Sequence, residues 1–174
     1  MTLEIRVVLP HDRPLLRAVL TDPALVQAYD LYAGEDGVEQ VFGTDHVPAD
    51  AVHVAQLDGE PVGFALALLL PAERPWAMLR GFVRPQVRRR GVGRALLEHL
   101  MAYLARQPHR PDLTEVACGA WEPHEPVRAL LEPAGFRHEH TYWLMERPRG
   151  PLAAPVWPAG VTVRTLAQGA AIAD

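Results

Sequence analysis

Lysine is missing from this chain of 174 residues, so its 17 strongly basic side chains are all arginines. Together with 17 prolines, this composition is typical of a GC-rich coding sequence. Cysteine is nearly missing as well, because Cys118 is the single one in the sequence. One cysteine excludes an internal disulfide, which agrees with a reducing cytoplasm.

An excess of positive charge is also missing, since the formal net charge is −4. This argues against general nucleic-acid binding, which needs a positive field to displace counterions. No apolar run approaches the roughly 20 residues that cross a bilayer, and the longest, 64–70, indicates a buried strand. The first residues show no basic segment followed by an apolar stretch, so we expect no signal peptide. We therefore expect a cytoplasmic protein without nucleic-acid or membrane partners.

Apolar periodicity and turn residues predict a mixed α/β fold of the α+β type. Asp58-Gly59 between two apolar runs predicts a hairpin, Asp12 is expected to cap the first helix, and 34–50 is expected to be a loop. The expected order is β-α-α-β-β-β-α-β-α-β, a largely antiparallel sheet flanked by helices. The strands are expected at 3–8, 52–57, 62–70, 76–83, 113–120 and 138–145, and the helices at 12–20, 23–32, 91–106 and 126–133.

The segment 83–97 contains the strongest chemical signal, because a basic, glycine-containing turn joins a strand directly to an amphipathic helix. Gly91 and Gly93 allow the backbone to approach a bulky anion, and the free amides and dipole of the helix start favour negative charge. Four arginines surround this point and can neutralise phosphates: Arg88, Arg89, Arg90 and Arg94. The pattern predicts a phosphate cradle.

Other phosphate-binding motifs do not fit this segment. A nucleotide-binding P-loop requires Gly-Lys-Ser/Thr, which is absent. A dinucleotide fingerprint requires a third glycine where Leu96 stands. No aromatic residue lies among the arginines to stack on a base.

Two landmarks give the chain a family resemblance. Arg88-x-x-Gly91-x-Gly93, preceded by Val83-x-Pro85, resembles the acetyl-CoA signature of the GNAT N-acetyltransferase superfamily. Ala134-Gly135-Phe136 is similar to the aliphatic-Gly-Phe triplet that ends a later helix in that family. The likeness covers about residues 3 to 146 in the expected element order, and the first motif is the more specific of the two.

The resemblance implies a bacterial N-acetyltransferase that moves the acetyl group of acetyl-CoA to a small-molecule or peptide primary amine, without an acyl-enzyme and without a metal. It implies that backbone amides of 88–94, Val92 included, hold the pyrophosphate. Phe82 and Val83 would pair with pantetheine in a gap between the strands 76–83 and 113–120, and an amide there would steady the thioester oxygen. His124, where many relatives carry an Asn, is expected beside the cofactor.

The catalytic positions depart from the family. Many relatives carry a Tyr four residues before the glycine as proton donor, and Leu131 stands there; the strand 76–83 lacks the frequent Glu base. We therefore assign no catalytic residue, and a non-catalytic acyl-CoA-binding domain remains the alternative. Cys118 is expected to be core filler. Conceivable substitutes for the missing groups are Glu73, Glu122, His124, His46 and Asp36, and the aromatic residues that could line an acceptor pocket or simply pack are Tyr29, Tyr32 and Trp76.

The C-terminal part predicts a second unit. We expect one domain at 1–147, a proline-rich linker at 148–160 and a tail strand within 161–174. Val161-Thr162-Val163-Arg164 repeats the pattern of Leu3-Glu4-Ile5-Arg6, as the first strand of another GNAT-like unit would. Alternatively, this strand pairs with the sheet of its own chain or of a neighbour, and the latter would form a homodimer.

Overall fold

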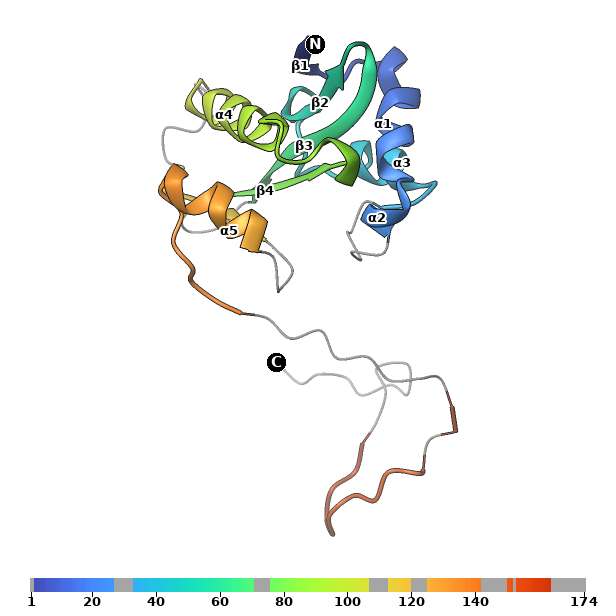
Figure 1. The fold of residues 1–174 in the computed structure, drawn as a ribbon. Helices are drawn as coiled ribbons and strands as arrows, with labels where there is room; N and C mark the ends of the chain where they lie inside the picture. The colour runs from blue at the N-terminus through green and yellow to red at the C-terminus, as the bar shows by residue number, and fades with distance from the viewer. Residues whose placement is uncertain are drawn as a thin grey trace. The chain divides into compact units, whose positions relative to one another are not determined.

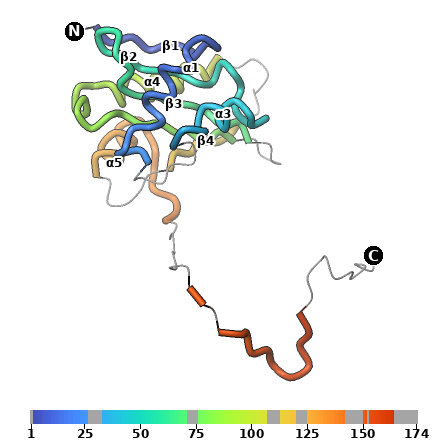
Figure 2. The backbone as a smooth tube through the Cα atoms, turned by 90° about the vertical axis from the view of Figure 1, so that its right-hand side faces the viewer, coloured from blue at the N-terminus to red at the C-terminus, as the bar shows by residue number. Residues whose placement is uncertain are grey.

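The architecture is a five-stranded sheet between two groups of helices (Figure 1). The computed structural model describes residues 2–26, 33–70, 76–106, 113–119, 125–141, 150–151 and 153–163. In order across the sheet lie β1 (Leu3–Val7), β2 (Val52–Leu57), β3 (Glu60–Leu70), β4 (Trp76–Val83) and β5 (Glu115–Cys118). Figure 2 shows β1 to β4 following one another across the sheet. The first four strands are antiparallel, and β5 runs parallel to β4.

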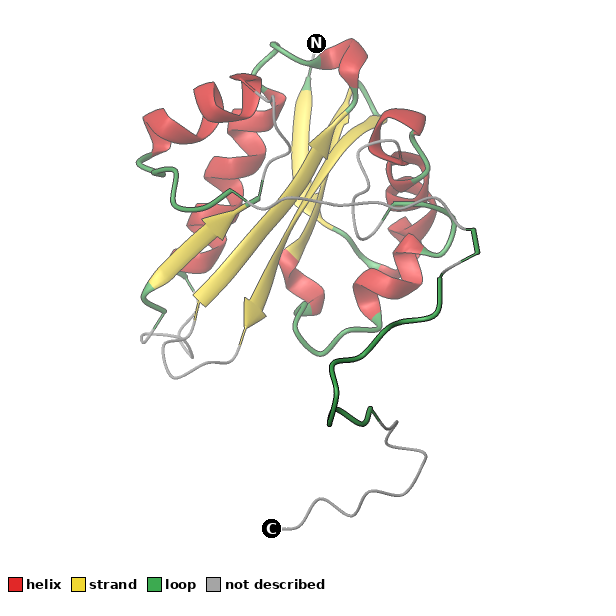
Figure 3. Ribbon diagram, turned by 90° about the horizontal axis from the view of Figure 1, so that it is seen from below, coloured by secondary structure: helices red, strands yellow, loops and turns green. Residues whose placement is uncertain are grey.

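The helices cover both faces of the sheet (Figure 3). On one face lie α1 (Arg13–Leu20), α2 (Pro23–Val26) and α3 (Gly37–Phe42), packed on Phe64, Leu66 and Leu68 of β3. On the other lie α4 (Val92–Ala105) and α5 (Glu125–Leu131), packed on the alternate β3 side chains Ala65, Ala67 and Leu69. Successive side chains of the buried strand β3 point to opposite faces of the sheet, so β3 contributes to a hydrophobic core on each face. None of the described helices is long and apolar enough to cross a membrane.

The central elements follow the sequence expectation closely. The β2–β3 hairpin turns at Asp58 (φ 51°) and Gly59 (φ 87°), the left-handed pair that an Asp-Gly hairpin requires. β4 has the expected bounds, and Arg84 donates its backbone N–H to the Val62 carbonyl before Pro85 ends the ladder. Gly135, at φ 90°, terminates the last helical segment as expected.

Two expectations near the N-terminus are wrong. The segment 34–50 is not all loop, because it contains α3, whose Val38 and Val41 are fully buried. One turn of apolar spacing outweighs the Gly and Asp content there. Asp12 precedes α1 but makes no side-chain cap to it. Its carboxylate instead accepts the Arg6 guanidinium and the Leu9 N–H, because the buried pairing with Arg6 satisfies both side chains.

Differences also occur at the ends of other elements. The second helix is described as far as Val26, and the rest of its expected range lies outside the described residues. Of the expected strand 138–145, residues 138–141 are exposed and have no strand structure, while 142–145 lie outside the described residues.

The chain divides into two units, Met1–His138 and Glu139–Asp174. In the second unit the described residues contain no helix or strand, and their one turn is centred on Gly160 (φ 85°), with Val161 donating to the Pro158 carbonyl. Of the expected tail strand, 161–163 has no strand structure, and residues from 164 onward lie outside the described residues. The linker and the second unit of the same fold remain predictions.

Candidate functional site

A tight backbone reversal links the end of β4 to the start of α4. After a 3-10 turn at Pro85–Val87, Arg89 adopts φ 64° and Gly91, the N-cap residue of α4, adopts φ 84°. Both values lie in the left-handed region, which a residue with a side chain adopts at a cost. The glycine at 91 removes that cost at one of the two positions, so the chain can enter α4 directly.

The first turn of α4 has backbone amides without a partner inside the helix, beside exposed arginines. The first intrahelical bond runs from the Ala95 N–H to the Gly91 carbonyl, so the amides of Val92, Gly93 and Arg94 have no partner within the helix. The predicted residues Arg89, Arg90 and Arg94 are exposed around this turn. Unpaired amides, the positive end of the helix dipole and exposed arginines thus occur in one short segment, a combination that favours an anion such as a diphosphate.

Arg88 contacts the end of β4. Its Nε donates to the Val83 carbonyl at 3.0 Å, and its guanidinium carbon lies 5.7 Å from the centre of the Phe82 ring. The side chain thus lies over the last residues of the strand, while its backbone begins the basic turn. Arg88 thus connects the end of β4 with the basic turn before α4.

Gly93 and Val92 differ from Gly91 in their surroundings. A Cβ atom at Gly93 would lie 3.5 Å from Leu130 of α5 and 3.9 Å from Val83, whereas a Cβ at Gly91 would meet nothing within 4 Å. A Cβ at Gly93 would therefore make only ordinary contacts with α5 and β4. Val92 is 1% exposed and belongs to the core, so its side chain is not available to a ligand.

The C-terminal half of β4 has an open side. Pairing with β5 stops at Leu79 and Cys118, and β4 continues for four more residues to Val83. Among the described residues no strand pairs with that stretch on the β5 side. In an antiparallel strand, the backbone N–H and C=O groups of successive residues point alternately to the two sides. Because Arg84 donates its N–H to Val62, Phe82 also directs its backbone groups to β3. Gly81 and Val83 direct theirs to the open side.

This alternation identifies Gly81, which sequence reasoning missed. Gly81 is exposed, and a side chain there would meet the Phe64 carbonyl at 3.0 Å and Ala65 at 3.3 Å. The signal in the sequence is a glycine inside a strand, which often marks close backbone approach. Phe82, one of the predicted residues, is 8% exposed and packs its ring into the core between the sheet and α1.

Arg84 is a second residue that sequence reasoning missed. Its Nη2 donates to the Ala18 carbonyl at 2.6 Å, and its Nε lies 3.3 Å from the Asp22 carboxylate. The Ala18 carbonyl belongs to the last turn of α1 and Asp22 follows the helix, so the Arg84 cation also interacts favourably with the helix dipole. Arg84 therefore fixes the strand end that leads into the basic turn. A contact across more than 60 positions has no local sequence signal.

Of the residues suggested for proton transfer or for an acceptor pocket, the described ones lie away from the open side of β4. The His46 carbonyl accepts the Leu69 N–H, and Leu69 pairs with Ala77 of β4. Ala77 precedes Gly81 by four residues, so His46 lies near a point of β4 that is roughly 13 Å along the strand from Gly81. Asp36 is exposed at the start of α3, on the face opposite α4. Trp76 is half-buried at the far end of β4. Five other candidates lie outside the described residues: Glu73, Glu122, His124, Tyr29 and Tyr32.

Two side chains near the open side are unsuited to proton transfer. Burial raises the pKa of the Cys118 thiol to about 11, so the thiol is neutral at physiological pH and inert as a nucleophile. Leu131 is half-buried against the core beneath α4, and its carbonyl accepts the Phe136 N–H at 3.2 Å. No three His, Cys, Asp or Glu side chains are placed to hold a metal ion in the part of the chain that is described.

Comparison with known proteins relates the chain to acetyltransferases. The pattern of the acetyltransferase (GNAT) family matches residues 19–136. A mycothiol acetyltransferase of Salinispora arenicola (strain CNS-205) is 33% identical over 128 residues, which cover 71% of this chain and 38% of that protein. The chain thus matches well under half the length of this relative.

Solved structures share the fold. Aminoglycoside acetyltransferase AAC(6')-Iy, in complex with a bisubstrate analogue of CoA, superposes with a TM-score of 0.62 at 20% identity, covering 84% of this chain and 99% of that one. A ribosomal-protein-alanine N-acetyltransferase from Brucella melitensis biovar Abortus 2308 gives 0.64 at 17% identity, with the same coverage of 84% and 99%. At these identities the likeness concerns the fold.

Proposed function

Because the chain belongs to the GNAT acetyltransferase family, we propose that it transfers the acetyl group of acetyl-CoA to a primary amine. One observation carries the proposal. The basic turn at the start of α4 directly follows the stretch of β4 that lacks a neighbour, so a phosphate site and a groove for an extended ligand are adjacent. Acetyl-CoA has this composition, with a pyrophosphate followed by an extended pantetheine arm.

The pyrophosphate fits the first turn of α4. Amides of Gly91 to Arg94 would donate to its oxygens, and the exposed guanidinium groups of Arg89, Arg90 and Arg94 would balance its charge. The open space beside Gly91 supports this assignment, since a Cβ built there would meet no described atom within 4 Å. Before the ligand binds, Arg88 holds the turn against the end of β4 through its bond to the Val83 carbonyl.

The pantetheine arm fits the open side of β4. Gly81 and Val83 expose backbone groups there, so an amide-containing arm would pair with them as an added strand does. The bond from Arg88 to the Val83 carbonyl would then be exchanged for one from the ligand. An amide of this stretch, pointing at the thioester oxygen, would stabilise the negative charge that develops as the amine attacks.

The acetyl-CoA thioester supplies the acyl group, and the chain supplies position and electrostatics. The acceptor reacts as the neutral amine, because an ammonium has no lone pair. The described residues provide no evident base beside Gly81, so we propose that the acceptor loses its proton to water or to a group outside them. We further propose a small-molecule amine, since structural neighbours include aminoglycoside acetyltransferases.

The side chain at position 131 favours a second function, the binding of acyl-CoA without catalysis. It occupies the position where many relatives carry a proton-donating Tyr, and it packs against the core. An apolar side chain cannot protonate the departing thiolate. A domain that binds acyl-CoA without turning it over would have no need of this proton.

Calorimetric titration with acetyl-CoA, followed by an assay of free thiol with a panel of amines, tests both functions. Binding together with amine-dependent thiol release supports the transferase. Binding without release for any amine supports the non-catalytic domain. Absence of acetyl-CoA binding at millimolar concentration contradicts both.

A further inference from the structure

Strand β1 forms one edge of the described sheet. β1 ends the sheet, and no described strand pairs with its outer side. The Val8 N–H donates to the Val52 carbonyl and the Asp58 N–H to the Thr2 carbonyl, so the even-numbered residues direct their backbone groups to β2. By alternation, Leu3, Ile5 and Val7 direct N–H and C=O groups outward. Such an edge is a template for another strand.

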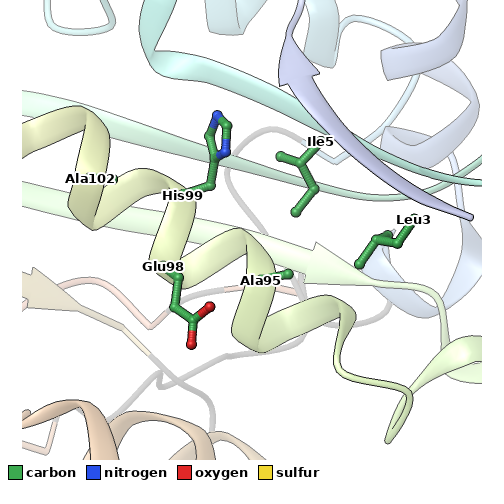
Figure 4. A pocket seen from close by; sticks show the side chains of 6 residues that line it. All are labelled: Leu3, Ile5, Ala95, Glu98, His99 and Ala102. Carbon is green, nitrogen blue, oxygen red and sulfur yellow. The ribbon is translucent and has the colours of Figure 1, made fainter.

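A hollow of about 450 Å³ lies beside this edge (Figure 4). Leu3 and Ile5 of β1 form one wall. The other is a stripe of α4 with the spacing of one helix face: Ala95, Glu98, His99 and Ala102. Two alanines in this stripe leave room for a neighbouring element. We call Leu3–Val7 together with these four α4 residues the β1–α4 edge surface.

We propose that the β1–α4 edge surface binds a second copy of the chain, with β1 pairing antiparallel to the partner's β1. A two-fold axis through Ile5 places Ile5 opposite the partner's Ile5 and Leu3 opposite the partner's Val7. These are the residues whose backbone groups point outward, so the hydrogen-bonding pattern and the symmetry agree. The result is a continuous ten-stranded sheet, in addition to any contact made by the tail.

Charge complementarity favours a copy of this chain as the partner. In the same register Glu4 lies opposite the partner's Arg6, and the symmetric pair repeats the contact. Opposite charges at directly facing positions of antiparallel strands attract each other. Arg6 is held in place by Asp12 and already lies 3.8 Å from Glu4 of its own strand, with 30% of its side chain exposed. Its position is therefore fixed before association.

The apolar side chains are self-complementary as well. Leu3, Ile5 and Val7 share the face of β1 that packs beneath α4, since Leu3 and Ile5 contact that core. A two-fold axis perpendicular to the sheet keeps equivalent faces together, so the two α4 helices lie on the same side and run antiparallel. Their stripes, with Ala95 and Ala102, then close over the two hollows.

Sedimentation velocity of the full chain over a range of concentrations tests the proposal. We expect a dimer for the wild type. Ile5→Pro should weaken the dimer about tenfold or more, because it removes an outward N–H at the symmetry axis without removing a bond to β2. Glu4→Arg should weaken it similarly by placing like charges opposite each other. Glu60→Arg, the same charge change at an exposed position of the β2–β3 hairpin, is the matched control and should remain dimeric.

Circular dichroism establishes whether each variant is folded, and Glu4→Arg serves as the test should Ile5→Pro unfold. A monomeric wild type at about 100 μM overturns the proposal, since a specific homodimer should form well below that concentration. A dimer that persists in folded Glu4→Arg also overturns it. A dimer lost on removal of residues 151–174 but unaffected by the β1 substitutions would instead assign the contact to the tail.

Discussion

At the scale of single residues, Gly91 and Gly93 are close in sequence and differ in what they require. Gly91 needs its left-handed φ of 84°, while a Cβ at Gly93 would make ordinary contacts with Leu130 and Val83. We predict that Gly91→Ala costs about 1–2 kcal/mol of stability from the φ angle and clearly weakens acetyl-CoA binding. Gly93→Ala should leave binding nearly unchanged. Calorimetry on the two variants checks this, and equal losses of affinity would contradict it.

His53 makes the stability depend on pH. It is 1% exposed and lies edge-on to His99 with ring centroids 4.6 Å apart, and its Nδ1 has no hydrogen-bond partner in the described part of the chain. Burial, assisted by His99, lowers its pKa to about 4 from an ordinary 6.5. In this range the unfolded chain binds more protons than the folded one, so the free energy of unfolding falls as the pH drops.

The expected loss is about 3 kcal/mol between pH 6.5 and pH 4, since each unit of pKa shift corresponds to 1.36 kcal/mol. Urea unfolding at a series of pH values measures it. His53→Gln should flatten the curve in this range, whereas His11→Gln, at a side chain that is 75% exposed, should not. An unchanged slope in His53→Gln would mean that another group causes the effect.

At the scale of elements, Arg84 ties the end of β4 to the end of α1. We predict that Arg84→Met costs about 1–3 kcal/mol, because it removes a charged hydrogen bond to Ala18 and leaves the Asp22 carboxylate without this cation. Acetyl-CoA binding should weaken as the strand end loosens. Arg128→Met, which removes an exposed bridge to Glu132, is the control and should cost only a few tenths of a kcal/mol. Similar losses in both variants would contradict a positioning role for Arg84.

Helix α5 offers a test of the missing proton donor. Leu131→Tyr places a hydroxyl where many relatives have one, and Leu131→Phe matches its size without the hydroxyl. If protonation of the thiolate limits the rate, we expect thiol release by the Tyr variant to exceed that of the Phe variant by about tenfold or more. Equal rates would show that a hydroxyl at this position does not contribute.

The sequence predicted elements better than contacts between them. β4 and the Asp-Gly hairpin were predicted well, because alternation, Pro85 and a left-handed turn pair are local signals. The basic turn was predicted because its arginines and glycines are also a local signal. The short helix α3 was missed, since six residues carry too little periodicity. The pairings Arg84–Asp22 and Arg6–Asp12 depend on side chains that tertiary packing brings together. The role of Gly81 depends on which residues of β4 direct their backbone groups away from β3, and this follows only from the observed strand pairing.

At the scale of the whole molecule, we propose that the cofactor site lies within the N-terminal unit. All the described parts of the site belong to residues 79–94 and to helix α5, whereas the C-terminal unit begins at Glu139. We predict that removing residues 151–174 leaves the affinity for acetyl-CoA nearly unchanged. Calorimetry of the shortened chain measures this, and loss of binding or of cooperative unfolding would show that the tail completes the domain.

The most direct measurement is the stoichiometry of acetyl transfer. The protein is incubated with acetyl-CoA and each member of an amine panel, and free CoA thiol and acetylated amine are quantified together, by thiol titration and mass spectrometry. Transfer predicts equal amounts of both products with at least one amine, and a lower yield of both in Gly91→Ala. Thiol release without acetylated amine, or no turnover with any amine despite tight acetyl-CoA binding, would contradict it.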